Sequence, residues 1–230
     1  PKKFAALGGE PTIHPKLCEI IEMSHKYWVG SELMLVSNGW FLERHPRLPE
    51  VLAACDVRFD ISIHHDGPAY TERMAEILPL VERWTKEYNL NTTVRPSYGG
   101  WRRIFRRSGR DMVPYTDNDP QESWNSCISR WCMQLHEGKI WKCPQVAFLG
   151  MMHKKFGLDE KLWRPMLDYM PLRHDQTDEE MREFFVREVE PAICSLCPAR
   201  PERMRINSPV PHQLEDLGPP LRASGPPSAP

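Results

Sequence analysis

The chain has 230 residues, of which 40% are hydrophobic and 27% are charged, and its formal net charge is -1. This length can supply one sizeable core or two modest ones. The near balance of charge excludes a strong overall attraction to nucleic acid or to an anionic membrane. No apolar run approaches the roughly 20 residues that cross a bilayer. We therefore expect a cytoplasmic protein with no membrane partner, and nucleic acid is an unfavoured partner.

Residues 1 to about 100 alternate short apolar runs with longer segments of helical periodicity. This alternation is typical of βαβ units around a parallel sheet. Strands are predicted at 3–7, 32–39, 57–64 and 91–97, and helices at 15–28, 48–55 and 71–88.

The strand at 57–64 alternates strictly, with Phe59 and Ile61 on one face and Asp60 and Ser62 on the other. Parallel sheets usually bury two apolar faces. A polar face suits a barrel whose helices cover the outside while its lumen holds a polar ligand. An edge strand with one solvated face is the alternative.

Two glycines and a carboxylate, Gly8, Gly9 and Glu10, follow the first predicted strand. Glycines let the backbone approach a ligand closely and adopt conformations closed to other residues. The carboxylate would lie at the carboxyl edge of the sheet, where α/β folds usually bind ligands. A plain strand-to-helix turn explains the same residues equally well.

Three strand ends carry a resemblance: Gly8-Gly9-Glu10-Pro11, Ser37-Asn38-Gly39 and Ser62-Ile63-His64. In order and spacing they resemble the radical S-adenosylmethionine (radical SAM) superfamily across roughly residues 4 to 100. In that superfamily the glycine and glutamate stretch holds the cofactor's methionine amino group, and later strand ends contact its ribose and carboxylate. The resemblance assigns S-adenosylmethionine binding to Gly8, Gly9, Glu10, Pro11, Ser37, Asn38, Ser62 and Arg95. For Asn38 and Ser62, a structural role in a turn or in the lumen is the alternative.

The resemblance implies an enzyme that cleaves S-adenosylmethionine reductively to a 5'-deoxyadenosyl radical. This radical would abstract hydrogen from a small-molecule or peptide substrate, and a flavodoxin or ferredoxin would donate the electron. The superfamily's Cys-x3-Cys-x2-Cys loop, which holds the catalytic four-iron cluster, does not occur in the 230 residues. We interpret the sequence as a fragment that lacks the first strand and the cluster loop. A degenerate relative is the alternative.

Five of the seven cysteines lie in the second half of the chain, at Cys127, Cys132, Cys143, Cys194 and Cys197. Glu137-Gly138 is a two-residue sequence typical of a hairpin loop. If these two residues form the loop, each residue of one strand faces the residue of the other strand whose number adds with its own to 275. Cys132 would then oppose Cys143, with Cβ atoms about 5 Å apart on one face. Cys194-Ser195-Leu196-Cys197 adds a Cys-x2-Cys pair of soft ligands.

A cysteine-bearing hairpin followed by a distant Cys-x2-Cys resembles the SPASM and Twitch class of auxiliary-cluster domains, which implies a second 4Fe-4S cluster. The usual Cys-x(9 to 15)-Gly-x4-Cys spacing of that class fits Cys127, Gly138 and Cys143. The hairpin register instead favours Cys132, which we prefer, with Cys127 as the alternate ligand. Spacing alone does not separate zinc from an iron-sulfur cluster.

The predicted fold class is α/β. A partial (β/α) barrel of radical SAM type spans 1–112, and a small cysteine-rich domain of hairpin and helices spans 113–205. The tail, 206–230, is rich in proline, glycine and serine, and we expect it to be disordered.

A second function class stays open, namely a non-catalytic zinc or iron-sulfur module. Its contact with an anionic partner or RNA would use the arginine-rich segment 101–110, WRRIFRRSGR. A solvated connecting segment is the plainer interpretation of those arginines. Cys18 and Cys55 stand alone and are interpreted as small buried hydrophobes.

The missing cysteine triplet gives a first prediction. The purified 230-residue chain, supplied with S-adenosylmethionine and dithionite, is expected to form no 5'-deoxyadenosine above a protein-free control, as measured by chromatography. Its formation in proportion to the protein would contradict this interpretation.

Overall fold

The structure is a computed structural model, and it describes residues 1–98 and 100–204. The chain divides into two compact units, Pro1–Trp101 and Arg102–Met204. The predicted disordered tail lies outside the described residues. No helix in the described part is long and apolar enough to cross a membrane.

The first unit is built on one parallel sheet whose strand order follows the chain, β1-β2-β3-β4. The strands are β1 (Lys3–Ala6), β2 (Glu32–Ser37), β3 (Arg58–Ile63) and β4 (Thr92–Pro96). The α-helices between them are α1 (Leu17–Tyr27), α2 (Leu48–Ala54) and α3 (Pro68–Glu87), and the short 3-10 turns are η1 (Pro11–Ile13) and η2 (Leu42–Arg44). The four predicted strands and three predicted helices are thus confirmed.

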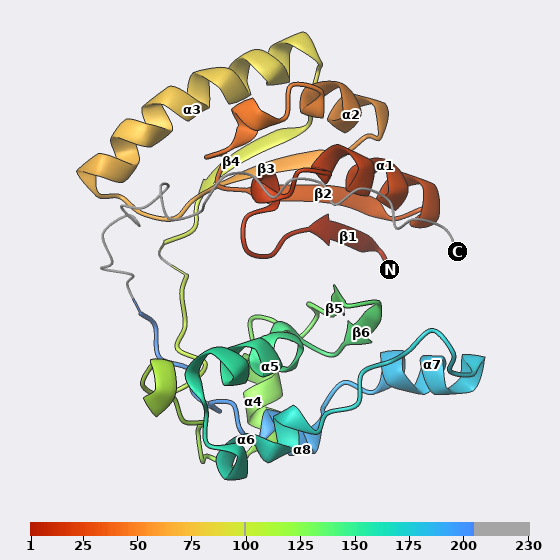
Figure 1. The fold of residues 1–230 in the computed structure, drawn as a ribbon, viewed down its shortest axis with the longest axis vertical. Coiled ribbons are helices and arrows are strands. Elements are labelled where there is room, and N and C mark those ends of the chain that lie inside the picture. The colour runs from red at the N-terminus through yellow and green to blue at the C-terminus, as the bar shows by residue number, and fades with distance from the viewer. Residues whose placement is uncertain (99, 205–230) are drawn as a thin grey trace, which may run out of the picture. The chain divides into compact units, whose positions relative to one another are not determined.

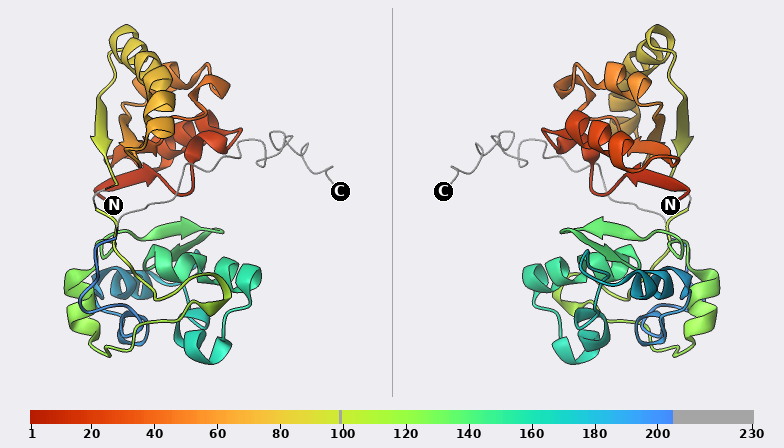
Figure 2. Two further views of the ribbon diagram at one scale, coloured as in Figure 1. Left: turned by 90° about the vertical axis from the view of Figure 1, so that its left-hand side faces the viewer. Right: turned by 90° about the vertical axis from the view of Figure 1, so that its right-hand side faces the viewer.

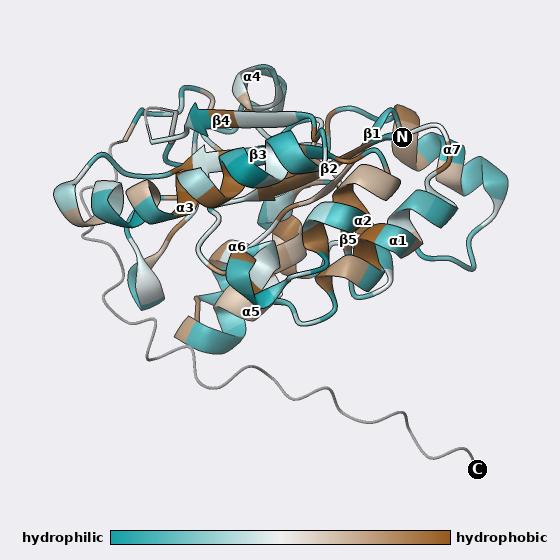
Figure 3. Cartoon of the chain, turned by 90° about the horizontal axis from the view of Figure 1, so that it is seen from above, coloured by the Kyte–Doolittle hydropathy of each residue, from teal (hydrophilic) through white to brown (hydrophobic). Residues whose placement is uncertain are grey.

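All three α-helices pack on one face of this sheet (Figures 1 and 2). Phe59 and Ile61 of β3 are fully buried in the same core cluster as Leu17 of α1, Leu52 of α2 and Ile77 of α3. Figure 3 shows the apolar residues of β2 in brown beside these helices. Doubly wound sheets, in contrast, carry helices on both faces.

On the opposite face of the sheet β3 carries polar residues, as its alternation predicts. Asp60 and Ser62 are only 2% and 3% exposed. Because β3 lies between β2 and β4, the alternative of an edge strand with a solvated face is wrong. The α/β class with a parallel sheet is therefore established.

The second unit consists of short helices and one hairpin. Its elements are η3 (Gly109–Asp111), α4 (Pro120–Ser126), β5 (Gln134–His136), β6 (Lys139–Trp141), α5 (Pro144–Phe156), α6 (Glu160–Leu167), α7 (Asp178–Val186) and α8 (Pro191–Cys194). Their core centres on the fully buried Trp163 and Leu149. Phe105 meets Trp163 edge to face, with ring centroids 4.8 Å apart.

The boundary between the units precedes Arg102, whereas the sequence placed it at 112. The arginine-rich segment belongs to the second unit because its partners lie there. Arg106 donates two hydrogen bonds to the carbonyl of Pro114, at 3.2 and 3.0 Å, and the backbone N–H of Arg103 donates to Glu202 O. Of the arginine side chains, that of Arg106 is thus engaged within the second unit.

Gly39, which follows β2, gives a prediction about the first core. Its φ of +80° is one that L side chains rarely adopt, and an added Cβ would lie 2.7 Å from Cγ2 of Ile77. Gly39→Ala is expected to lower the free energy of unfolding by about 1–2 kcal/mol or more. Denaturant titration measures the loss. Gly100→Ala is the control because an added Cβ there meets nothing within 4 Å; equal stability of the two variants would refute the argument.

Candidate functional site

Two groups of predicted site residues are brought together, one in each unit. The first lies at the carboxyl ends of the parallel strands. Gly8 and Gly9 follow β1 with φ of +121° and +54°, conformations that favour glycine. They turn the chain so that Glu10 precedes η1 and reaches the end of β2.

The carboxylate of Glu10 joins this loop to the next strand. Its Oε1 accepts hydrogen bonds from the N–H of Thr12 at 3.0 Å, the hydroxyl of Thr12 at 2.6 Å and the hydroxyl of Ser37 at 2.6 Å. Its Oε2 accepts from the N–H of Asn38 at 2.8 Å. Oε2 keeps acceptor capacity for a cationic ligand group, but the contacts of Glu10 are in the first place structural.

The turn after β2 is held by its own side chains. The hydroxyl of Ser37 accepts from the N–H of Gly39 at 2.8 Å, and Oδ1 of Asn38 accepts from the N–H of Trp40 at 2.9 Å. The second contact is an Asx turn. Both predicted cofactor residues are therefore engaged in shaping the turn.

Ser62 and Arg95 are neighbours across β3 and β4 and share the polar face. Beside them, Asp60 accepts from the Arg58 guanidinium at 2.8 and 3.3 Å, and the Arg95 guanidinium lies 3.7 Å from its second oxygen. A carboxylate buried to this extent requires such partners. The alternation in the sequence predicted polar residues on this face, but it did not predict the contacts of Asp60 with Arg58 and Arg95.

Three polar atoms near the same edge are buried without a hydrogen-bond partner. They are Nε1 of Trp40 after β2, Nδ1 of His64 after β3 and Oγ of Ser97 after β4. Burial also lowers the pKa of His64, which keeps the imidazole neutral at neutral pH. Unpaired buried polar groups are costly and are candidates for contact with a ligand. The sequence singled out neither Trp40 nor Ser97.

The second group of site residues depends on the hairpin of β5 and β6. Gln134 pairs with Trp141 and Leu135 with Ile140, which confirms the predicted register. Glu137 and Gly138 have φ of +50° and +69°, as a two-residue type I′ turn requires.

The ladder ends at Gln134 and Trp141, two residues short of the cysteines. Cys132 lies in a turn, where its N–H donates to Ser129 O at 2.9 Å, and it is exposed. Cys143 is the N-cap of α5. Cys132 therefore lies beyond the paired strands, and the choice between Cys132 and Cys127 as a ligand stays a prediction.

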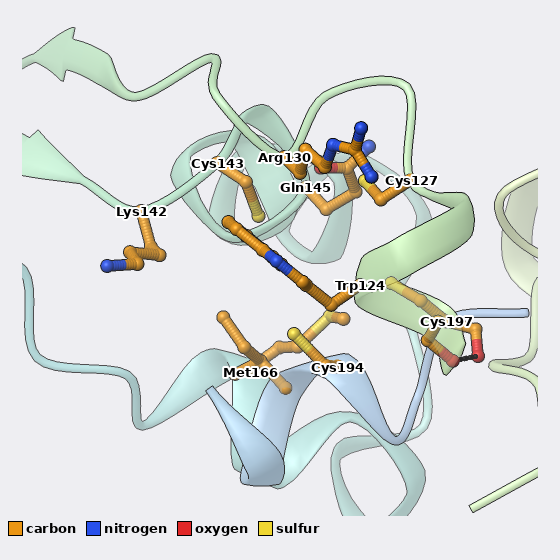
Figure 4. A pocket seen from close by; sticks show the side chains of 11 residues that line it. Trp124, Cys127, Arg130, Lys142, Cys143, Gln145, Met166, Cys194 and Cys197 are labelled. Carbon is orange, nitrogen blue, oxygen red and sulfur yellow. Dashed lines mark hydrogen bonds between the residues drawn. The ribbon is translucent and has the colours of Figure 1, made fainter. Parts of the chain in front are cut away.

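The alternate cysteine, Cys127, lines a cavity together with three other cysteines. This small cavity is lined by the four thiols of Cys127, Cys143, Cys194 and Cys197 (Figure 4). The remaining lining residues are Ser123, Trp124, Arg130, Lys142, Gln145, Met166 and Ile193.

Helix termini position the four thiols. Cys127 caps the end of α4 and Cys143 the start of α5, while Cys194 ends α8. The next turn, closed by a hydrogen bond from Cys197 N to Cys194 O at 3.1 Å, brings Cys197 back to the cavity. The hydroxyl of Ser123 in α4 donates to Cys197 O at 2.9 Å, which ties the Cys-x2-Cys segment to α4.

Burial around the cavity disfavours the ionised, thiolate form of the four cysteines. Burial raises the pKa of Cys143 to about 11, and the charges of Cys127 and Cys194 act in the same direction. Burial likewise raises the pKa of Cys197, Cys194 and Cys127. A bound cation would supply the positive charge that lets these sulfurs ionise.

The four thiols are a donor set that either zinc or a four-iron cluster accepts. Within residues 1–98 and 100–204, no three His, Cys, Asp or Glu side chains are grouped closely enough to hold a metal ion. Tetrahedral zinc is held directly by its sulfurs, through Zn–S bonds of about 2.3 Å. A four-iron cluster takes one thiolate at each iron.

The other two cysteines are structural. Cys55 is buried in the core of the first unit, and Cys18 packs against it. Both are small hydrophobes, as predicted.

Comparison with known families, with curated proteins and with solved structures found no match to this chain. The geometry of the two groups of residues therefore carries the functional argument.

The hydrogen bonds of Glu10 give a prediction. Glu10→Ala is expected to lower the free energy of unfolding by about 1–3 kcal/mol, because it leaves donors from Thr12, Ser37 and Asn38 without their acceptor. Glu72→Ala, at an exposed position of α3, should stay within about 0.5 kcal/mol of the parent. Denaturant unfolding compares the two; a Glu10 variant as stable as the Glu72 variant would show that these bonds contribute nothing.

Proposed function

We propose that this chain is part of a radical SAM enzyme whose second unit, residues 102–204, binds an auxiliary 4Fe-4S cluster. The observation that carries the proposal is the convergence of Cys127, Cys143, Cys194 and Cys197 on one cavity. These four thiols also satisfy the cysteine and glycine spacing typical of SPASM and Twitch domains. Cys132, which breaks that spacing, lies apart.

The first unit supports the same assignment. Its strand order and one-sided helix layer are those expected of a partial (β/α) barrel. The loop of Gly8 to Pro11 lies at the carboxyl edge beside Ser37 and Asn38. In a radical SAM barrel this edge binds S-adenosylmethionine, and the polar face with Asp60, Ser62 and Arg95 lines the lumen.

Each part of the chain then has a defined task. When bound, an auxiliary cluster supplies electron transfer or a point of attachment for substrate. The chain's own part is to provide four thiolates, to exclude water from them and to hold cofactor and substrate in position. Four thiols whose pKa values are raised by burial stay protonated without metal, so cluster binding would release protons.

The resemblance of the cysteine and glycine spacing to SPASM and Twitch domains favours the cluster over the zinc module, because four thiols by themselves suit either centre. The arginine-rich segment, which an RNA-binding module would use, has partners within its own unit.

Cysteine substitutions give a decisive prediction. Anaerobic reconstitution with iron and sulfide should give about four irons per chain, measured by colorimetric assay with the absorption spectrum. Cys127→Ser, Cys143→Ser, Cys194→Ser and Cys197→Ser should each lose most of this iron, because each removes a cluster ligand.

The matched controls are Cys132→Ser, Cys18→Ser and Cys55→Ser, which should keep the iron of the parent chain. Loss of iron in Cys132→Ser with full retention in Cys127→Ser would return the ligand role to Cys132. A parent chain that takes up zinc and no iron would refute the proposed function.

A further inference from the structure

Two arginine-bearing segments from the two ends of the second unit are paired with each other. Arg102 and Arg203 are partners in an isolated antiparallel bridge. Residues 102–110 contain five arginines and no acidic residue, and residues 200–203 add two arginines and one glutamate. The whole chain has a formal net charge of -1, so this concentration of positive charge is a local feature.

On one side of the bridge the charges are balanced. Successive residues of paired segments face opposite sides. Next to the bridge, the N–H of Arg103 donates to Glu202 O at 2.9 Å, and its guanidinium lies 3.9 Å from the carboxylate of Glu202. Burial raises the pKa of the nearby Tyr115, and the charge of Glu202 acts in the same direction while that of Arg103 opposes it. An arginine and a glutamate thus share this side.

On the other side, Arg102 faces Arg203. Residues directly opposite each other in an antiparallel pair have Cβ atoms about 5 Å apart, and like charges at such positions are destabilising. Arg102 is half-buried and Arg203 is exposed. Neither guanidinium forms an ion pair with a carboxylate of residues 1–98 or 100–204. Within this part of the chain, nothing offsets the repulsion between the two positive groups.

Two opposed guanidinium groups suit an anion with several acceptor oxygens. Each presents five N–H donors in a planar fork that matches the oxygens of carboxylate and phosphate. A phosphate monoester carries a charge of about -1.5 to -2 at neutral pH and three acceptor oxygens, so it can accept from both forks at once. One pair of arginines serves one phosphate group, whereas a polynucleotide needs a row of basic contacts along its strand.

We propose that Arg102 and Arg203 form an anion clamp that binds the phosphate group of a small phosphorylated ligand. The clamp goes beyond the proposed function and needs no metal. A phosphate held between the two guanidinium groups removes their repulsion and joins the first segment of the second unit to its last.

The test measures the binding of phenyl phosphate to the purified full-length chain, without reconstitution, by isothermal titration calorimetry. Arg102→Gln and Arg203→Gln each remove one guanidinium from the clamp. Arg182→Gln is the matched control, because it removes an exposed charge from α7 of the same unit. Circular dichroism is recorded first; Arg203 is exposed, so its variant decides the test if Arg102→Gln does not fold. Single-stranded oligouridine is the second probe, because it carries phosphate on a polynucleotide.

We expect the parent and Arg182→Gln to bind phenyl phosphate alike. Each clamp variant should bind it at least about tenfold more weakly, because charge-assisted hydrogen bonds are lost. A parent that binds no phenyl phosphate, a folded clamp variant that binds as well as the parent, or an equal loss in Arg182→Gln would overturn the inference. Binding of oligouridine without binding of phenyl phosphate would assign this face to a polynucleotide and overturn it as well. The measurement does not depend on iron uptake, so failure of the clamp and failure of the proposed function are distinguishable.

Discussion

Burying four thiols around one small cavity is the constraint on which the second unit depends. The thiols come from segments far apart in the sequence, and each is positioned by a helix terminus or the turn after one. The ordering of these segments costs conformational entropy. The core around Trp163 and the hydrogen bond from Ser123 to Cys197 O offset part of that cost. A bound cluster would offset more, because ligand binding to the folded chain stabilises it.

In the first unit, the carboxylate of Glu10 is the group that holds neighbouring segments together. A single side chain accepts four hydrogen bonds and joins the loop after β1 to the turn after β2. The same edge holds the unpaired polar atoms of Trp40, His64 and Ser97. The edge is thus rigid around Glu10 and has unused hydrogen-bonding capacity around His64, which is a combination suited to a ligand site.

Local patterns in the sequence predicted the secondary structure of the first unit and the register of the hairpin. Apolar periodicity is a property of neighbouring residues, so the four strands and three helices of the first unit follow from it, and Glu137-Gly138 sets the hairpin register. The contacts of Glu10 were out of reach because Ser37 is 27 residues away. The hairpin register says nothing about where a ladder ends, so it could not decide between Cys132 and Cys127. The contact of Arg103 with Glu202 joins residues about a hundred positions apart, which no local pattern predicts.

The central claim is that Cys127, Cys143, Cys194 and Cys197 hold one four-iron cluster. The most direct measurement is anomalous diffraction at the iron edge from crystals of the anaerobically reconstituted chain. The account predicts a compact group of about four iron sites enclosed by these four sulfurs, with Cys132 outside. A single zinc site, or iron bonded to Cys132 in place of Cys127, would contradict it.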